Sequence, residues 1–446
     1  MVVQLAAAVA TISAAAAVVA VVRPAVAAAA TTWTTRSRSS RVAGPGVPLM
    51  AKQTAEQPLS GVRVLELTRL LPGPLAGRHL ADLGAEVIKV EDTEHGDYVR
   101  GIGAMKGENS GAFHALNRNK KSLRLDYRTD RGRGVFLALA ARSEVVLEGF
   151  RPGTMARLGL DYPTLRRGNP ALVYCALTGF GQDGPYRDRA GHDMNYASYA
   201  GMTDQVGNRG GPPANANFQY ADIAGGTMGA MMGILAALYD AQRSGQGRYI
   251  DVPITDCALA QMAVAWSQYE ATGRMPERGG DLISGKYPWY DFYQAADGGY
   301  VHLGALEWRF WRNFCDAVGR PEWADRQMAE GAEAEAMRAE IAAYFRREDR
   351  DALVARLAPL DTCVAPVLRL EECARAEAFR DRGLFVEVED PRDGVVAHIA
   401  FPVRFDGAAP TAPQPAPGWG EHSEAVLRAI DLPTAEIAAL RDDGII

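Results

Sequence analysis

Two short runs rich in β-branched and aliphatic residues, Val62–Leu67 and Glu86–Glu91, flank a helical segment. The chain between them turns at Leu71–Gly77, is predicted to be helical over Arg78–Leu83, and reaches a suitable helix C-cap at Gly84. A strand, a helix and a second strand in this order form a βαβ unit with parallel strands. This unit predicts an α/β protein with a doubly wound, Rossmann-like large domain.

The same pattern continues along the chain. Further strands are predicted at Ser122–Leu125, Val145–Leu147, Leu172–Leu177 and Arg248–Ile254, and a helix is predicted over Arg131–Arg142. Their alternation with helical segments agrees with a parallel sheet whose strands are joined by crossover helices.

The strongest helical signal covers residues 223–243, where three glycines recur every fourth residue from Gly225 to Gly233 and share one face. Each glycine weakens a helix by about 1 kcal/mol relative to alanine, so this face predicts very close packing against another element. A membrane span is the weaker alternative, because the apolar run is short and Asp222 and Asp240 bracket it. We therefore expect no membrane partner.

The middle of the chain has a different pattern. Tyr287–Tyr293 is aromatic, Asp297–Gly299 is typical of a hairpin turn, and Tyr300–Leu303 follows as a strand. A segment rich in proline, Pro402–Gly420, predicts a loop wrapped over the surface before a last helix at Leu432–Leu440. The segment at roughly 285–375 therefore has a pattern of its own.

The first fifty residues differ from the rest of the chain. Residues 2–30 are mostly alanine and valine, and no acidic residue precedes Glu56. An organellar transit peptide is one interpretation; a secretory signal or a membrane helix fits the composition less well. We favour a third interpretation, a start assigned too early, because Met50 begins an ordinary polar lead-in. The expected location is the cytoplasm, or an organelle if the leader is a genuine transit peptide.

Composition narrows the classes of function. The net charge of −6 argues against a nucleic-acid partner. The five cysteines are scattered without a metal-ligand spacing, so we expect reduced thiols and no metal site. Gly73 and Gly77 after the first strand form GxxxG rather than GxGxxG, which disfavours a nicotinamide cofactor.

The candidate catalytic residues are His192 and, thirty residues later, Asp222. A histidine and a carboxylate can supply the two proton-transfer groups of an acid/base enzyme. Two plainer interpretations stay open, a hydrogen-bonded core histidine for His192 and a helix N-cap for Asp222. Because a helix N-terminus lowers the pKa of an aspartate, a role as base predicts that the Asp222 side chain is enclosed.

Ten motifs occur in order along the chain: LSGVRVLELTRLLPGPLAG at 59–77, LADLGAEVIKVE at 80–91, NRNKKSL at 117–123, LEGFRPG at 147–153, LTGFGQDGPY at 177–186, AGHDMNY at 190–196, DIAGGTMG at 222–229, SGQGRYIDVPITD at 244–256, YDFYQAADGGYVHLGALE at 290–307 and PGWGEHSEAVL at 417–427. With these motifs the chain resembles the type III CoA-transferase (CaiB/BaiF) family, and within it the α-methylacyl-CoA racemases.

The resemblance implies particular roles. In transferases of this family, an aspartate that matches Asp193 attacks a thioester and usually follows a residue other than histidine. In the racemases, residues matching His192 and Asp222 form the acid/base pair, and a glutamate matching Glu307 supports the histidine. Gly191 belongs to the same Gly-His-Asp marker and is expected beside the bound acyl-CoA. These markers favour the racemases.

Acyl-CoA carries phosphates, so the resemblance also implies a basic binding surface. Arg118, Lys120 and Lys121 cluster in one motif, and Arg151 lies in the next. Their charge suits phosphate binding. The plainer alternative is ordinary solvated surface charge.

The expected function is therefore racemisation of 2-methylacyl-CoA thioesters by 1,1-proton transfer through an enolate, with no cofactor beyond the CoA of the substrate. The resemblance also implies an interlocked homodimer of two-domain chains. Its expected parts are a leader at 1–55, a large α/β domain with its linker at 56–284, a smaller α+β domain at 285–375, and a return to the large domain at 376–446. The alternatives are a CoA-transferase that works through an acyl anhydride on Asp193, and a non-catalytic acyl-CoA binder. Lys286 and Trp289 stand where the racemases commonly have glycines, so the acyl specificity is left open.

Overall fold

The computed structural model describes residues 57–407 and 412–446. These described residues form one compact unit. The leader predicted at residues 1–55 lies outside the described residues.

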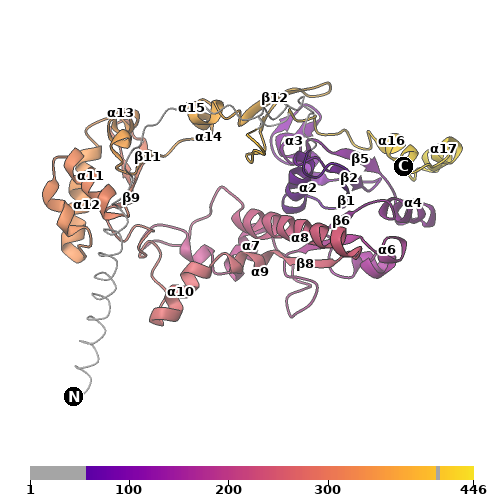
Figure 1. Ribbon diagram of the computed structural model, residues 1–446, viewed down its shortest axis with the longest axis horizontal. Coiled ribbons are helices and arrows are strands. Elements are labelled where there is room, and N and C mark those ends of the chain that lie inside the picture. Colours follow the sequence, from indigo (N-terminus) through magenta and orange to yellow (C-terminus); the bar gives the residue numbers. More distant parts are fainter. Residues whose placement is uncertain (1–56, 408–411) are drawn as a thin grey trace, which may run out of the picture. The chain divides into compact units, whose positions relative to one another are not determined.

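A six-stranded parallel sheet organises the larger part of the chain (Figure 1). The chain starts at the centre of the sheet, adds two strands on one side and then three on the other, which is the strand order of a doubly wound Rossmann-type sheet. Its strands, in spatial order, are β5 (Lys121–Arg124), β2 (Glu86–Glu91), β1 (Arg63–Glu66), β6 (Val145–Glu148), β7 (Val173–Thr178) and β8 (Tyr249–Pro253). The predicted parallel α/β sheet is confirmed.

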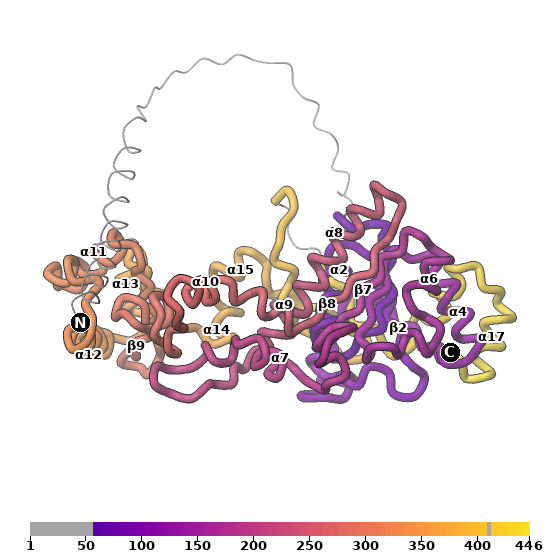
Figure 2. Tube along the Cα trace, turned by 90° about the horizontal axis from the view of Figure 1, so that it is seen from below, coloured from indigo at the N-terminus to yellow at the C-terminus, as the bar shows by residue number. Residues whose placement is uncertain are grey.

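Successive strand residues face opposite sides of the sheet and build two cores. Val64 packs in one core together with α2 (Pro72–Asp82) and α8 (Met228–Ser244). Leu65 packs in the other core, with α4 (Asp130–Ala140), α16 (Ser423–Arg428) and α17 (Thr434–Asp442). The chain end therefore returns to the large sheet, and Figure 2 shows α17 beside α4.

Two predicted helix starts need correction. Helix α2 begins at Pro72 rather than at Arg78, because proline is tolerated in the first turn, where no helical N–H partner is needed. Gly77 is a helical residue here, and a Cβ at this position would lie 1.9 Å from Glu66 Oε2. The helix predicted over 223–243 starts as a π-helix, Ala221–Thr227, before α8.

The glycine face of this helix packs as closely as predicted. A Cβ on Gly225 would lie 2.6 Å from the backbone oxygen of Ile254, in α9 (Ile254–Ala260), and a Cβ on Gly233 would lie 3.0 Å from Ile250. Ala221–Ser244 is also long and apolar enough to cross a membrane, judged by length and composition alone, and half of its most apolar window is buried. The close contacts with β8 and α9 account for the apolar residues on its buried face.

A separate core lies in the middle of the chain. Strands β9 (Tyr290–Gln294), β10 (Tyr300–Gly304) and β11 (Val364–Pro366) form an antiparallel sheet, so the predicted hairpin is confirmed. Trp289 is 1% exposed in this core, and its Nε1 donates a hydrogen bond to the backbone of Gln327 at 2.8 Å. The bulk of Trp289 is therefore used in packing. The helices here are α11 (Trp308–Ala317), α12 (Gly331–Phe345) and α13 (Arg350–Leu357).

Candidate active site

A cleft of about 390 Å³ opens at the carboxyl ends of the parallel strands. Its walls include Leu67–Leu70 after β1, Gly149–Pro152 after β6, Leu177–Phe180 at the end of β7 and Ile254 after β8. Strand order reverses between β1 and β6, and ligands of open α/β sheets bind in the crevice outside the strand ends at such a point. The fold therefore places this cleft where a substrate site is expected.

His192 lies in the wall of the cleft, immediately before α7 (Asp193–Tyr199). Its backbone N–H donates a hydrogen bond to Asn195 Oδ1 at 3.0 Å, which fixes the start of the helix. The Tyr196 hydroxyl donates to the backbone oxygen of Gly191, and a Cβ on Gly191 would lie 2.6 Å from the Tyr196 ring. Gly191 therefore permits this close approach, while the exposed His192 side chain borders the cleft.

Asp222 borders the same cleft from the π-helix that precedes α8. Its Oδ1 atom is buried and has no hydrogen-bond partner among the described residues. Burial, and secondly the nearby Asp193 carboxylate, raise the pKa of Asp222 to about 7. The side chain is half-buried with its Oδ1 enclosed, and with this pKa it can hold or release a proton near neutral pH. π-helical turns occur often at functional sites.

Asp193 lies beside this pair but is used differently. It is 7% exposed, and its Oδ1 accepts a hydrogen bond from the backbone N–H of Asp222 at 2.9 Å. It is absent from the described lining of the cleft. His192, Asp193 and Asp222 are thus brought together from the start of α7 and the π-helix, and Asp193 is the one of the three that does not line the cleft.

The structure does not bring Glu307 to this group within one chain. Glu307 is exposed immediately before α11, and no hydrogen bond or ion pair between it and His192 occurs among residues 57–407 and 412–446. The support that it was expected to give His192 is therefore not present in the isolated chain.

Two of the four basic residues expected to bind phosphate are buried. Lys120 Nζ lies 2.7 Å from Glu66 Oε2 and donates hydrogen bonds to the Pro74 backbone oxygen and Asn117 Oδ1, both at 2.8 Å. Arg118 is 1% exposed and pairs with Asp82 at 2.7 Å. The prediction that Arg118 and Lys120 bind phosphate is corrected, because both cations are enclosed and already partnered.

The other two basic residues, Lys121 and Arg151, lie at opposite ends of the parallel strands. Lys121 is the first residue of β5 and pairs with Glu86 at 2.5 Å. The amino ends of parallel strands lie on the same side of a sheet, opposite their carboxyl ends. Lys121 therefore lies at the end of the sheet away from the cleft. Arg151 follows β6 and lines the cleft, where its Nη1 donates to the Asp188 backbone oxygen at 2.9 Å. Of the four predicted residues, only Arg151 borders the site.

Three further arginines, Arg69, Arg187 and Arg189, line the cleft and were missed in the sequence. Arg69 pairs with Asp92. Arg187 and Arg189 lie within five residues of His192, and this spacing is the signal that could have identified them.

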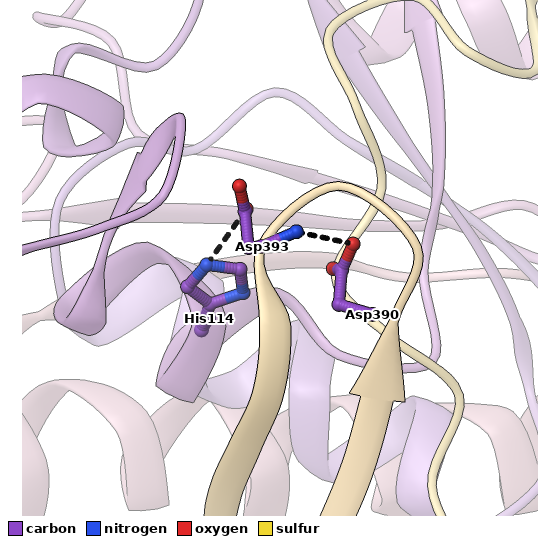
Figure 3. A group of neighbouring side chains, drawn as sticks. All are labelled: His114, Asp390 and Asp393. Atoms are coloured by element: carbon purple, nitrogen blue, oxygen red, sulfur yellow. Dashed lines mark hydrogen bonds and ion pairs between the residues drawn. The ribbon is translucent and has the colours of Figure 1, made fainter.

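One group outside the cleft has the side-chain types that bind metals: His114, Asp390 and Asp393, all buried (Figure 3). His114 Nε2 lies 3.0 Å from Asp393 Oδ2, and Asp393 Oδ1 accepts from the backbone of Glu108 at 2.6 Å. Asp390 accepts from two backbone N–H groups, and the Arg392 guanidinium lies 3.2 Å from its Oδ2. These carboxylate oxygens already have hydrogen-bond donors, so the group is better explained as a structural contact than as a metal site. It joins the turn between β12 (Phe385–Asp390) and β13 (Gly394–Ile399) to the hairpin of β3 (Met105–Lys106) and β4 (Asn109–Ser110).

Comparison with known proteins identifies the family of the chain. The family model for CoA-transferase family III matches residues 59–423. The chain is 35% identical over 390 residues to a succinate–glutarate CoA-transferase of Agrobacterium fabrum, covering 84% of this chain and 96% of that protein. It is 33% identical over 391 residues to an α-methylacyl-CoA racemase of Mus musculus, covering 87% and 97% respectively.

A solved structure of a CaiB/BaiF family protein from Brucella suis has the same fold. The TM-score is 0.75 at 31% sequence identity, and the match covers 84% of this chain and all of that one. Relatives named racemase and relatives named CoA-transferase occur at similar identity. The chain belongs to CoA-transferase family III, a family of enzymes that includes both activities.

Proposed function

We propose that this protein is an acyl-CoA racemase that interconverts the (R) and (S) forms of 2-methylacyl-CoA thioesters. One residue of the pair His192 and Asp222 removes the proton next to the thioester, and the other returns a proton to the opposite face of the resulting enolate. The CoA enters as part of the substrate, and no further cofactor takes part. The observation that carries the proposal is that both side chains border one cleft while Asp193 does not line it.

The protonation of Asp222 supports this assignment. A carboxyl group with a pKa of about 7 exists in both protonation states at neutral pH. A group that acts as a base in one direction and as an acid in the other must do so. A histidine ordinarily serves the same two roles near neutral pH. Proton transfer in either direction therefore needs no residue beyond this pair.

A CoA-transferase is the second candidate, favoured by the names of several relatives. In that reaction the Asp193 carboxylate attacks the thioester, releases CoA and holds the acyl group as an anhydride. Asp193 would have to leave its hydrogen bond with the backbone of Asp222 to do so, or attack through its second oxygen. Its low exposure makes it the less accessible of the two carboxylates beside the cleft.

A substitution at Asp193 separates the two reactions. Asp193→Asn keeps an oxygen that can accept the Asp222 N–H but cannot form an anhydride. The protein is incubated with one enantiomer of a 2-methylacyl-CoA in deuterated water, with and without an added carboxylate. We expect Asp193→Asn to retain deuterium incorporation at carbon 2 and loss of optical purity, and His192→Ala to lose both.

The opposite pattern would overturn the proposal. It is transfer of CoA to the added carboxylate, abolished by Asp193→Asn and retained in His192→Ala. Tight binding of acyl-CoA with neither reaction would leave the non-catalytic binder as the remaining function.

We also propose that the active form is a homodimer in which Glu307 approaches His192 of the other chain. Helix α8 carries an exposed apolar stripe, and its members include Met232, 60% exposed, and Tyr239, 64% exposed. Exposed apolar surface of this kind marks interaction sites. We expect a dimer in light scattering and a monomer without racemase activity for Met232→Asp/Tyr239→Asp. An active wild-type monomer would contradict this.

A further inference from the structure

The charge of the cleft is not explained by proton transfer alone. Four arginines line it, and Asp222 is the one carboxylate within its described lining. Arg69 has a carboxylate partner, Asp92. The remaining three form what we call the arginine cluster: Arg151 and Arg189, which have no carboxylate partner among the described residues, and Arg187, which lies 3.7 Å from the exposed Asp188. The positive charge of the arginine cluster therefore exceeds the negative charge of the side chains that line the cleft.

The arginine cluster is partly held in place by the protein. The Arg189 guanidinium lies 3.8 Å from the centre of the Tyr186 ring and donates a hydrogen bond to the Tyr199 hydroxyl at 2.5 Å. Arg151 donates to the backbone oxygen of Asp188, which is the residue between Arg187 and Arg189. The three side chains therefore belong to one wall of the cleft, and most of their N–H donors remain available for a ligand.

The cluster does not serve to neutralise Asp222. A guanidinium beside a carboxylate lowers its pKa, whereas burial and Asp193 raise the pKa of Asp222, and no arginine contributes. The anion that matches the cluster must therefore come with the ligand. Planar guanidinium groups suit carboxylates and phosphates in particular.

The position of the cluster favours the acyl end of the substrate. Arg189 is three residues before His192, so the Cα atoms of the two residues lie within about 11 Å of each other even in a fully extended chain. The phosphates of CoA are separated from the thioester by the long pantetheine arm. A group bound beside His192 is therefore closer to the reacting carbon than to the phosphates.

We propose that the arginine cluster binds a carboxylate carried by the acyl group, so that the preferred substrates are thioesters of branched dicarboxylic acids. This inference rests on the proposed racemase for its reaction, but the binding preference that it predicts does not depend on catalysis.

The test compares acyl groups that differ only in the carboxylate. Proton exchange at carbon 2 is measured with 2-methylsuccinyl-CoA, whose thioester is next to the methylated carbon, and with 2-methylbutanoyl-CoA. Binding of succinyl-CoA and butanoyl-CoA is measured by calorimetry. The wild type should favour the carboxylated member of each pair by about tenfold to a hundredfold, the range expected for charge-assisted hydrogen bonds. Arg187→Gln/Arg189→Gln should remove this preference without weakening the uncharged member.

Arg248→Gln is the matched control, because Arg248 is an exposed arginine paired with Asp240 and immediately precedes β8, at the other edge of the sheet. It should leave the preference unchanged. If the double variant binds both members of each pair more weakly by the same factor, the cluster binds the CoA phosphates and the inference is overturned. A wild type that shows no preference for the carboxylated member would also overturn it. Preferential binding of succinyl-CoA without any proton exchange would refute the racemase and leave the carboxylate site standing.

Discussion

Asp222→Asn is expected to abolish racemisation and, at the same time, to stabilise the folded protein above neutral pH. The asparagine cannot exchange a proton, and the loss of one general acid/base should lower kcat by about 10²- to 10⁴-fold. The gain in stability follows because the native carboxylate is partly buried, lacks a partner for Oδ1 and lies beside Asp193. Deuterium exchange and urea unfolding at pH 8 measure the two effects.

The pH dependence of this stabilisation has a definite sign. The pKa of Asp222 is about 7 in the folded protein, above the ordinary value of about 3.9 for the unfolded chain. The folded state therefore binds more protons between these values, and the wild type loses stability as the pH rises from about 4 to about 7. Because the group is partly solvent-exposed, we expect a gain on the order of 1 kcal/mol for Asp222→Asn at pH 8. The difference in stability between Asp222→Asn and the wild type should disappear near pH 4. A variant that is less stable than the wild type at both pH 4 and pH 8 would contradict this prediction.

Lys89→Met is expected to cause the largest loss of stability among the substitutions considered. Lys89 is fully buried, and its Nζ lies 3.2 Å from Glu66 and 2.8 Å from Asp97 and donates to the Thr68 backbone oxygen at 2.9 Å. Removing it leaves two buried carboxylates with Lys120 as the nearby cation. Breaking a buried ion pair in this way costs about 3–5 kcal/mol. The free energy of unfolding in urea measures the loss.

Lys121→Met provides the matched control. Lys121 pairs with Glu86 near the protein surface, and such exposed pairs contribute less than about 1 kcal/mol. Lys89→Met/Asp97→Asn should recover part of the loss, because it removes one of the stranded charges. Equal effects of the two single lysine substitutions would show that the buried charges do not stabilise the fold in the expected manner.

The strands were predictable because their signal is local. Most strands are short runs buried on both faces of the sheet, and such runs are rich in β-branched and aliphatic residues. The predicted strands agree with β1, β2, β5, β6, β7 and β8 to within one residue at each end. The start of α2 was not predicted, since Pro72 and Pro74 are equally typical of a turn and of a first helical turn.

The reacting residues of the site were predictable from the sequence, but most of the basic residues that line the cleft were not. His192 and Asp222 were identifiable from their motifs, and the fold brings both to one cleft. Lys120 and Lys121 are neighbours in the sequence, yet one is buried against Glu66 and the other lies at the edge of the sheet. Their partners are distant in the chain, so no local pattern distinguishes a structural cation from one available to a ligand.

The π-helical turn at Ala221–Thr227 makes the direction of Asp222 depend on chain length. Its hydrogen bonds join residues five apart rather than four, so the turn holds one residue more than an α-helical turn. Removing one residue would allow the segment to become α-helical while α8 and its glycine face stayed packed. A single-codon deletion, rather than any substitution, is then the smallest genetic change that reorients the carboxylate and keeps the scaffold intact.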